Sequence, residues 1–187
     1  MKENMKNISV IGLGSMGYGI AQSLIRSGYM VYGQDKNLLQ QKKIVEEGGQ
    51  VDEISYGDLD AVIIVVLNEA QTREIIFGSD GIAAKLNKNT LVMVCTTVSP
   101  NFAKEMATLC ENKELLYLDA PISGGSKKSS EGKLSYMISG NKNALDKARP
   151  ILEATSETVF EFGEVVGAGS AMKAVNQMLA GVHIAAM

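Results

Sequence analysis

The sequence predicts an α/β protein with a doubly wound, mainly parallel sheet that helices cover on both faces. Apolar runs of strand length alternate with helical patterns along nearly the whole chain, which is the rhythm of β-α-β units. The run 59–67 (LDAVIIVVL) is almost continuously β-branched and apolar, as expected for a strand buried on both sides. A glycine-rich turn follows the first strand, and the chain contains neither a Pro/Gly/Ser-rich linker nor an internal repeat.

The first part of the chain predicts four strands, each followed by a helix. Gly28 closes the first of these helices, and two glycines at 48–49 end the second. Ser99 and Pro100 match an N-cap followed by a proline in the first turn. The predicted strands are 8–14, 30–35, 59–67 and 90–98, and the helices that follow them are 16–28, 37–49, 69–77 and 100–113.

Three further strands are predicted in the second part of the chain, at 115–120, 134–139 and 158–162, with a helix over 143–155 between the last two. The polar segment 123–132 (SGGSKKSSEG) is either a mobile loop or a ligand-binding loop, and composition alone does not separate the two. The pattern breaks at 163–170 (GEVVGAGS), and an apolar helical run follows over 171–187.

The composition is that of a globular protein: 187 residues, 45% of them hydrophobic and 21% charged, have room for one domain and a little more. A net charge of −3 provides no basic surface for nucleic acid or membranes. Cys95 and Cys110 are too few for a disulfide framework and lack metal-ligand spacing. The sequence shows no signal peptide and no run of the ~18 apolar residues that a membrane span needs. We therefore expect a cytoplasmic protein that binds no metal.

The glycine-rich turn GLGSMG has the G-x-G-x-x-G spacing between a strand and a helix. In a Rossmann-type site the first glycine permits the tight turn, the second lets the backbone approach a pyrophosphate, and the third lets the helix pack closely on the sheet. An ordinary strand-to-helix turn is the alternative, but the position of the motif in the chain favours a dinucleotide site. The expected cofactor contacts come from Gly12, Leu13, Gly14, Ser15, Met16 and Gly17.

Asp35 supports the same prediction, because it ends the second strand roughly 20 residues beyond the loop. A carboxylate at that place accepts hydrogen bonds from the adenosine ribose and repels the 2′-phosphate of NADP. The neighbouring Lys36 weakens that discrimination. The sequence therefore favours NAD over NADP.

Three further loops follow the carboxyl ends of predicted strands, where ligands of such sheets bind. The loop 66–71 carries Leu67 and Asn68, which would pass near the ribose or pyrophosphate, and 95–100 offers Thr96 and Thr97. Ser and Thr at strand ends also commonly cap the next helix. The loop 119–133 offers Ser123, Gly124 and Gly125 to a substrate carboxylate.

The last helical run places Lys173, Asn176 and Gln177 on one face, at spacings i, i+3 and i+4. Its other residues are mostly apolar and could be buried all round. From spacing alone, a lysine that snorkels to solvent is favoured over a functional amine. His183, two turns further on, is expected to be a packing residue.

Taken together, four segments resemble the β-hydroxyacid dehydrogenase family, which includes 3-hydroxyisobutyrate dehydrogenase and is similar to 6-phosphogluconate dehydrogenase. The likeness runs through the whole chain in order, and the stretches YGQDKN, LNEAQTREIIFGSDGIA and NQMLAGVHIAA look closest to the L-threonate dehydrogenase branch. The four segments are GLGSMGYGIAQSL, CTTVSP, DAPISGGSKKSSEGKLSYMISG and GAGSAMKAVNQMLAGVHIAA.

The resemblance implies an NAD-dependent oxidoreductase that oxidises a hydroxyl of a small sugar acid or hydroxy acid. It implies that Lys173 is the catalytic acid/base and that Asn176 helps to hold lysine and substrate. It implies that the segment 123–125 holds the substrate carboxylate and that Thr97 lies beside the nicotinamide. The amine must be neutral to accept the hydroxyl proton, so burial should lower the pKa of Lys173.

The resemblance also implies a second, all-helical domain, for which this sequence has no counterpart. We therefore expect residues 1–166 to form the NAD-binding domain and 167–187 to begin an interdomain helix. Alternatives are a nucleotide-binding fragment without turnover, or the activity of 3-hydroxyisobutyrate dehydrogenase or tartronate semialdehyde reductase. The family suggests a homo-oligomer, and the apolar helix suggests that this fragment dimerises through 171–187.

Overall fold

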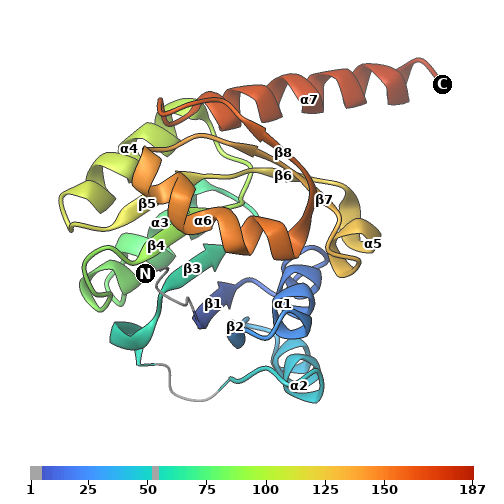
Figure 1. Ribbon diagram of the computed structural model, residues 1–187. Helices are drawn as coiled ribbons and strands as arrows, with labels where there is room; N and C mark the ends of the chain where they lie inside the picture. Colours follow the sequence, from blue (N-terminus) through green and yellow to red (C-terminus); the bar gives the residue numbers. More distant parts are fainter. Residues whose placement is uncertain (1–5, 52–54) are drawn as a thin grey trace.

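The computed structural model describes residues 6–51 and 55–187 (Figure 1). Its main sheet has five strands in the order β2-β1-β3-β4-β5, and all neighbouring pairs are parallel. The strand order reverses direction between β1 and β3, which creates a crevice at the carboxyl ends of the strands. The strands are β1 (Asn7–Ile11), β2 (Met30–Gln34), β3 (Ala61–Ile64), β4 (Leu91–Val94) and β5 (Leu116–Asp119).

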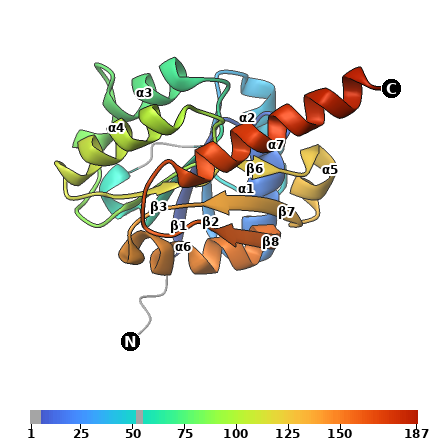
Figure 2. The same cartoon turned by 90° about the horizontal axis from the view of Figure 1, so that it is seen from above.

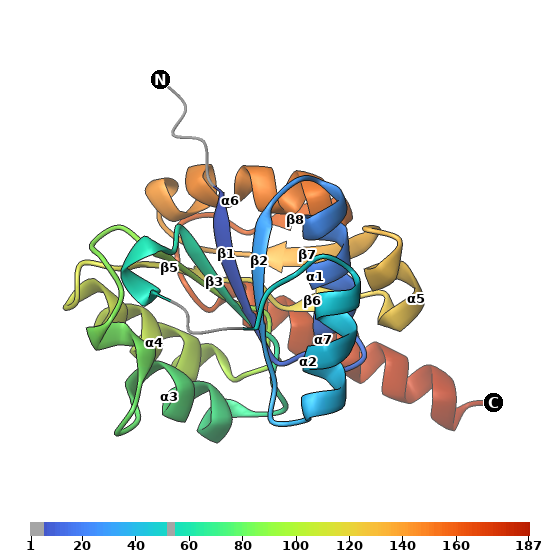
Figure 3. The ribbon, with the colours of Figure 1, turned by 90° about the horizontal axis from the view of Figure 1, so that it is seen from below.

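Helices cover both faces of this sheet, with α6 on one side and α3 and α4 on the other (Figure 3). Successive strand residues point to opposite faces, so Ile63 joins the core beneath α1 and α6, whereas Ile64 joins the core beneath α3 and α4. The helices are α1 (Gly17–Arg26), α2 (Leu38–Glu46), α3 (Glu69–Phe77), α4 (Pro100–Glu111), α5 (Gly125–Ser130), α6 (Lys142–Thr155) and α7 (Ala168–Ala185), with short 3-10 turns η1 (Tyr56–Asp58) and η2 (Ile82–Ala84).

The last three strands form a second sheet, in the order β6 (Ile122–Ser123), β7 (Leu134–Ile138), β8 (Ser156–Glu161). β7 runs antiparallel to β6 and parallel to β8. An isolated antiparallel bridge between Asp119 and Ser139 links this sheet to β5. The α/β class and the mainly parallel sheet are confirmed, but β7 reverses direction because only a short connection separates it from β6.

The predicted strands and helices are present, and most strands are shorter than the apolar runs suggest, although β8 begins two residues before the predicted 158–162. β1 stops at Ile11 because Gly12 turns the chain at a φ of +93°, and β3 covers only four residues of the run 59–67. Ser99 caps α4 and Pro100 lies in its first turn, as predicted. The segment 123–132 is not a mobile loop, since it forms the end of β6 and the helix α5.

Helix α7 begins at Ala168, three residues earlier than the predicted run. Its first turns pack on β7, β5 and α4, and its C-terminal half projects beyond the sheets (Figure 2). In residues 6–51 and 55–187, no helix is both long and apolar enough to cross a bilayer.

Candidate functional site

The residues predicted to bind the cofactor follow the carboxyl ends of neighbouring parallel strands, and these ends meet at one edge of the sheet. The glycine loop follows β1, and Asp35 follows β2. Leu67 and Asn68 follow β3, and Thr97 follows β4. Ser123, in β6, comes four residues after the end of β5. The fold therefore gathers segments that are far apart in the sequence.

The first and third glycines of the loop are required by close packing. Gly12 has a φ of +93°, and a Cβ there would lie 2.2 Å from the carbonyl oxygen of Val65. A Cβ at Gly17 would lie 1.8 Å from the carbonyl oxygen of Gly12. A side chain at either position would therefore force the turn or the helix α1 away from the sheet.

Gly14 differs, because a Cβ there would meet nothing within 4 Å and the residue lines an open cleft. The N–H groups of Gly14, Ser15 and Met16 donate to no acceptor within residues 6–51 and 55–187. They precede α1, at the end of the helix that favours anions. This part of the loop is therefore free to receive a pyrophosphate. Packing within the protein does not require a glycine at position 14, unlike at positions 12 and 17.

Asp35 holds the glycine loop to the end of β2. Its Oδ2 accepts a hydrogen bond from the N–H of Leu13 (2.7 Å), and its Oδ1 accepts one from the N–H of Asn37 (2.8 Å). A carboxylate has about four acceptor positions, so two remain for a ligand. The side chain is half-buried and lines the same cleft as Gly14.

This cleft has a volume of about 840 Å³ and lies between the segments that follow β1, β2 and β3. Gly12, Gly14, Asp35 and Leu67 line it, so it unites four of the predicted cofactor residues. The remaining wall is largely apolar and includes Ile11, Val51, Tyr56, Val65, Val66 and Ile75. A mainly apolar cleft with a few converging polar groups is typical of cofactor sites.

The loops after β3 and β4 are tied to each other by Thr96, which is buried and accepts a hydrogen bond from the N–H of Val66 (3.1 Å). Thr97 is exposed. Asn68 caps α3, because its side chain accepts a hydrogen bond from the N–H of Gln71 (2.9 Å). Leu67 is 85% exposed at the rim of the cleft. Thr96 and Asn68 thus have structural roles, whereas Thr97 and Leu67 face solvent.

The predicted carboxylate loop turns sharply after Ser123. Gly124 and Gly125 have φ values of +130° and +73°, which favour glycine, and both are exposed. Ser123 is half-buried at the end of β6. None of the three lines the cleft described above.

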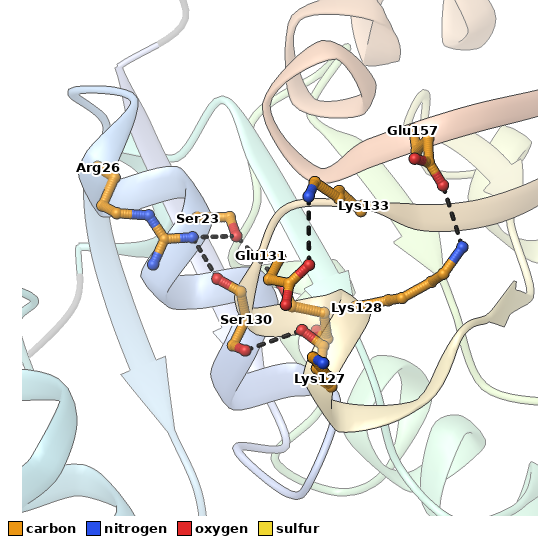
Figure 4. A network of polar contacts seen from close by, with 9 residues as sticks. Ser23, Arg26, Lys127, Lys128, Ser130, Glu131, Lys133 and Glu157 are labelled. Atoms are coloured by element: carbon orange, nitrogen blue, oxygen red, sulfur yellow. Dashed lines mark hydrogen bonds and ion pairs between the residues drawn. The ribbon is translucent and has the colours of Figure 1, made fainter.

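Helix α5 packs against α1, a contact that the sequence did not reveal. The Ser129 hydroxyl donates to the carbonyl oxygen of Met16 (2.5 Å), and the Ser23 hydroxyl donates to that of Ser129 (3.1 Å). Figure 4 shows Arg26 reaching from α1 to the carbonyl oxygen of Ser130 (2.5 Å). Because Met16 is the N-cap of α1, these hydrogen bonds connect the glycine loop to the helix that follows the 123–125 turn. Two serines in a polar stretch were the only signal of this contact.

Lys173 is buried, with 6% of its surface exposed, and burial lowers its pKa below the usual value of 10.5. Within the described parts of the chain it takes part in no ion pair. The snorkelling expected from spacing is therefore wrong. Asn176 is half-buried one turn later. Burial of the helix all round is also wrong, because Met178 is 71% exposed.

The structure thus gathers some of the predicted residues around the cleft and leaves others outside it. Gly12, Gly14, Asp35 and Leu67 share the cleft, whereas Lys173 belongs to α7, whose first turn lies at the carboxyl end of β5. Tight packing of α7 on the sheet was not visible in the sequence, because a helical pattern does not show which element covers a given face.

Comparison with known proteins agrees with this architecture. Residues 7–163 match the sequence family described as the NAD binding domain of 6-phosphogluconate dehydrogenase. L-Threonate dehydrogenase of Haemophilus influenzae is 41% identical over 190 residues, covering 100% of this chain and 63% of the relative. The corresponding enzyme of Pectobacterium atrosepticum is 42% identical, covering 96% of this chain and 60% of the relative.

Among solved structures, a 3-hydroxyisobutyrate dehydrogenase from Salmonella typhimurium superimposes with a TM-score of 0.92 at 38% identity. That likeness covers 97% of this chain and 64% of the solved chain. The chain therefore spans about three fifths of the length of the relatives that it matches.

Proposed function

The chain belongs to the family of the NAD-binding domain of 6-phosphogluconate dehydrogenase, and we propose that it is the cofactor-binding part of an NAD-dependent dehydrogenase acting on a small hydroxy acid. The observation that carries this proposal is the loop in which Gly12 and Gly17 are required by packing while Gly14 stays open to the cleft. Three neighbouring N–H groups that have no acceptor in the described part of the chain point to a bound phosphate group.

The residues around the cleft favour NAD over NADP. Asp35 retains acceptor capacity toward the cleft after its two backbone hydrogen bonds, which suits the two hydroxyls of a ribose. A 2′-phosphate at the same place would face the negative charge of Asp35, and among the described residues that line the cleft only Lys36, which is exposed, carries a positive charge to offset that repulsion. NAD, when bound, supplies the hydride acceptor for the oxidation.

Lys173 is the proposed general base, with Asn176 on the same face of α7. Burial disfavours the charged form of the amine, so a larger fraction is neutral at a given pH and able to take the proton of the substrate hydroxyl at Nζ. In the reverse reaction the protonated amine returns that proton. Asn176 lies one turn further and would hold the substrate and the lysine by its amide.

The turn at Ser123, Gly124 and Gly125 is the proposed site for the substrate carboxylate. The two exposed glycines leave their backbone accessible, and the Ser123 hydroxyl is available as a donor. Thr97, exposed beside this edge of the sheet, is the proposed contact to the nicotinamide. The relatives named above favour L-threonate as the substrate, with 3-hydroxyisobutyrate as the second candidate.

We further propose that residues 1–166 act as the NAD-binding domain and that 167–187 connect it to the remaining part of the active site. The relatives are longer than the matched region by about two fifths of their length. Because a substrate site in such enzymes needs walls on both sides, the chain by itself should bind NADH with negligible turnover.

The test is a panel of L-threonate, 3-hydroxyisobutyrate and glycerate with NAD or NADP, run on the whole protein and on Lys173→Ala. We expect NAD-dependent oxidation of one panel member and its loss in the variant, with NADH binding retained. No cofactor-dependent oxidation of any of the three would refute the proposed reaction, and full activity of Lys173→Ala would refute the role of the lysine.

A further inference from the structure

We propose that Asp119 is a positioning residue that holds the first turn of α7 on the sheet and so keeps Lys173 in its buried place. This inference rests on the proposed role of Lys173. Asp119 is the last residue of β5 and is fully buried. It lies four residues before Ser123, between the proposed carboxylate loop and the lysine helix.

Four donors converge on the Asp119 carboxylate. Its Oδ2 accepts hydrogen bonds from the Ser139 hydroxyl (3.0 Å) and from the N–H groups of Gly167 (3.1 Å) and Ser170 (2.9 Å). Its Oδ1 accepts one from the Ser170 hydroxyl (2.6 Å). The first N–H groups of a helix have no partner within it, so Asp119 caps α7 from a different element, with a charge sign that suits the helix N-terminus.

Ser139 completes the connection between β5, the end of β7 and α7. Its hydroxyl oxygen accepts a hydrogen bond from the N–H of Gly169 (3.1 Å) while its proton goes to Asp119. The backbones of Ser139 and Asp119 exchange two hydrogen bonds, of 2.9 and 3.0 Å, in the bridge that joins the two sheets. Three elements therefore meet at one buried polar cluster.

The helix backbone lies directly on the sheet at this cluster. A Cβ at Gly169 would lie 2.3 Å from the carbonyl oxygen of Met137 and 3.2 Å from Asp119 Oδ2. Ser170 and Lys173 are three residues apart on one face of α7, with 1% and 6% of their surfaces exposed. The placement of the first turn therefore sets where Lys173 lies one turn later.

Asp119 acts on Lys173 through the helix rather than through its charge. Burial is what lowers the pKa of Lys173, whereas burial raises the pKa of Asp119 against the opposing effect of its hydrogen bonds. The side chain of Lys104, in α4, also approaches the start of α7, since its Cε would lie 3.3 Å from a Cβ at Gly167. Because burial lowers the pKa of Lys173, release of the first turn of α7 should expose Lys173 and raise that pKa toward the ordinary value.

The test follows the pH dependence of acetylation of Lys173 by mass spectrometry, in the unchanged protein, Asp119→Asn and Asp119→Ala. The Lys173 midpoint is the pH at which the acetylation rate of Lys173 reaches half its maximum. Asparagine keeps an acceptor oxygen for the N–H groups of Gly167 and Ser170, so we expect Asp119→Asn to have the same Lys173 midpoint as the unchanged protein. Alanine leaves both groups without an acceptor, and we expect an upward shift of about half a unit or more. The rising limb of the pH–kcat profile should move in the same direction.

Asp60→Ala is the matched control, because the Asp60 carboxylate also accepts two backbone hydrogen bonds, from Lys6 (2.8 Å) and Asn7 (3.0 Å). These lie at the amino ends of β1 and β3, away from Asp119 at the carboxyl end of β5. It should lower stability and leave the Lys173 midpoint unchanged. If Asp119→Ala does not fold, the double variant Ser139→Ala/Ser170→Ala replaces it, with a smaller upward shift expected.

An unchanged Lys173 midpoint in folded Asp119→Ala, or in the double variant, would overturn the proposal. An equal shift in Asp60→Ala would do the same, because it would indicate general loosening. Acetylation needs no turnover, so this test is separate from that of the proposed function. If Lys173→Ala keeps full activity, the catalytic role fails while the midpoint still decides whether Asp119 positions the helix.

Discussion

A buried amine without an ion-pair partner is the most unusual residue of the described chain. Lys173 has 6% of its surface exposed, and burial alone is the resolved cause of its lowered pKa. A lysine in such a place destabilises the folded state relative to an apolar residue of similar size. The fold tolerates that cost at the position where a neutral amine is proposed to act as a base.

Lys173→Met should therefore increase stability, and in the whole protein it should remove turnover. The pKa of Lys173 is lower in the folded chain than the ordinary 10.5, so the unfolded chain binds more protons between the two values. The destabilisation is fully present below the folded pKa and disappears as the pH rises toward 10.5. We expect a higher free energy of unfolding for the variant at pH 7 and a flatter pH dependence above it, measured by urea unfolding. Lower stability of Lys173→Met at pH 7 would contradict this account.

At the scale of elements, the contact between α5 and α1 joins the two proposed ligand loops. The Ser129 hydroxyl donates to the carbonyl oxygen of Met16, and a Cβ at Gly19 would lie 2.5 Å from the N atom of Ser130. The close approach of the helices therefore depends on small residues. The exposed ion pairs of this region, Lys128 with Glu157 and Lys133 with Glu131, contribute little.

Ser129→Ala tests that contact. The change removes one partly buried hydrogen bond, and we expect the free energy of unfolding to fall by about 1 kcal/mol. Ser126→Ala is the control, since Ser126 lies in the same helix and is exposed. The measurement is urea unfolding of both variants. Equal stabilities would show that the Ser129–Met16 hydrogen bond does not hold α5.

The elements also show what the sequence could and could not predict. The strands of the main sheet follow from apolar runs such as 59–67, and the glycine loop follows from its spacing. Helix α5 was missed because its serines and lysines carry no apolar face, and its order comes from tertiary contacts with α1. The burial of Lys173 followed from the family resemblance but not from spacing, because the spacing of a helix does not show that Asp119 and Ser139 hold its first turn on a sheet.

At the scale of the whole molecule, the reversal of strand order between β1 and β3 places the cleft beside the glycine loop. Helix α7 begins beside β5, on the other side of the main sheet from the cleft. It carries an apolar surface away from the core. Met178, Leu179 and Val182 lie on one face of the helix and are 71%, 55% and 64% exposed. Such a contiguous apolar surface is typical of a contact with another protein segment.

We therefore expect this chain to dimerise through α7 as its concentration rises. Val182→Glu should shift the protein toward monomer, because it places a charge within the apolar surface. Gln177→Glu, an exposed position on the same helix, should leave the association unchanged. Size-exclusion chromatography with light scattering reports the mass, and a monomer at every concentration would exclude this association.

The most direct test of the central claim is NADH binding to Gly14→Ala, followed by the fluorescence of NADH itself because the chain has no tryptophan. A Cβ at Gly14 meets no protein atom within 4 Å, so the variant should fold with an unchanged unfolding midpoint. Gly181→Ala is the matched control, since a Cβ there also meets nothing.

If the loop receives the pyrophosphate, the new methyl group occupies ligand space. NADH affinity of Gly14→Ala should then fall at least tenfold, about 1.4 kcal/mol, while Gly181→Ala binds as the unchanged protein does. Equal NADH affinity in a folded Gly14→Ala protein would contradict the account.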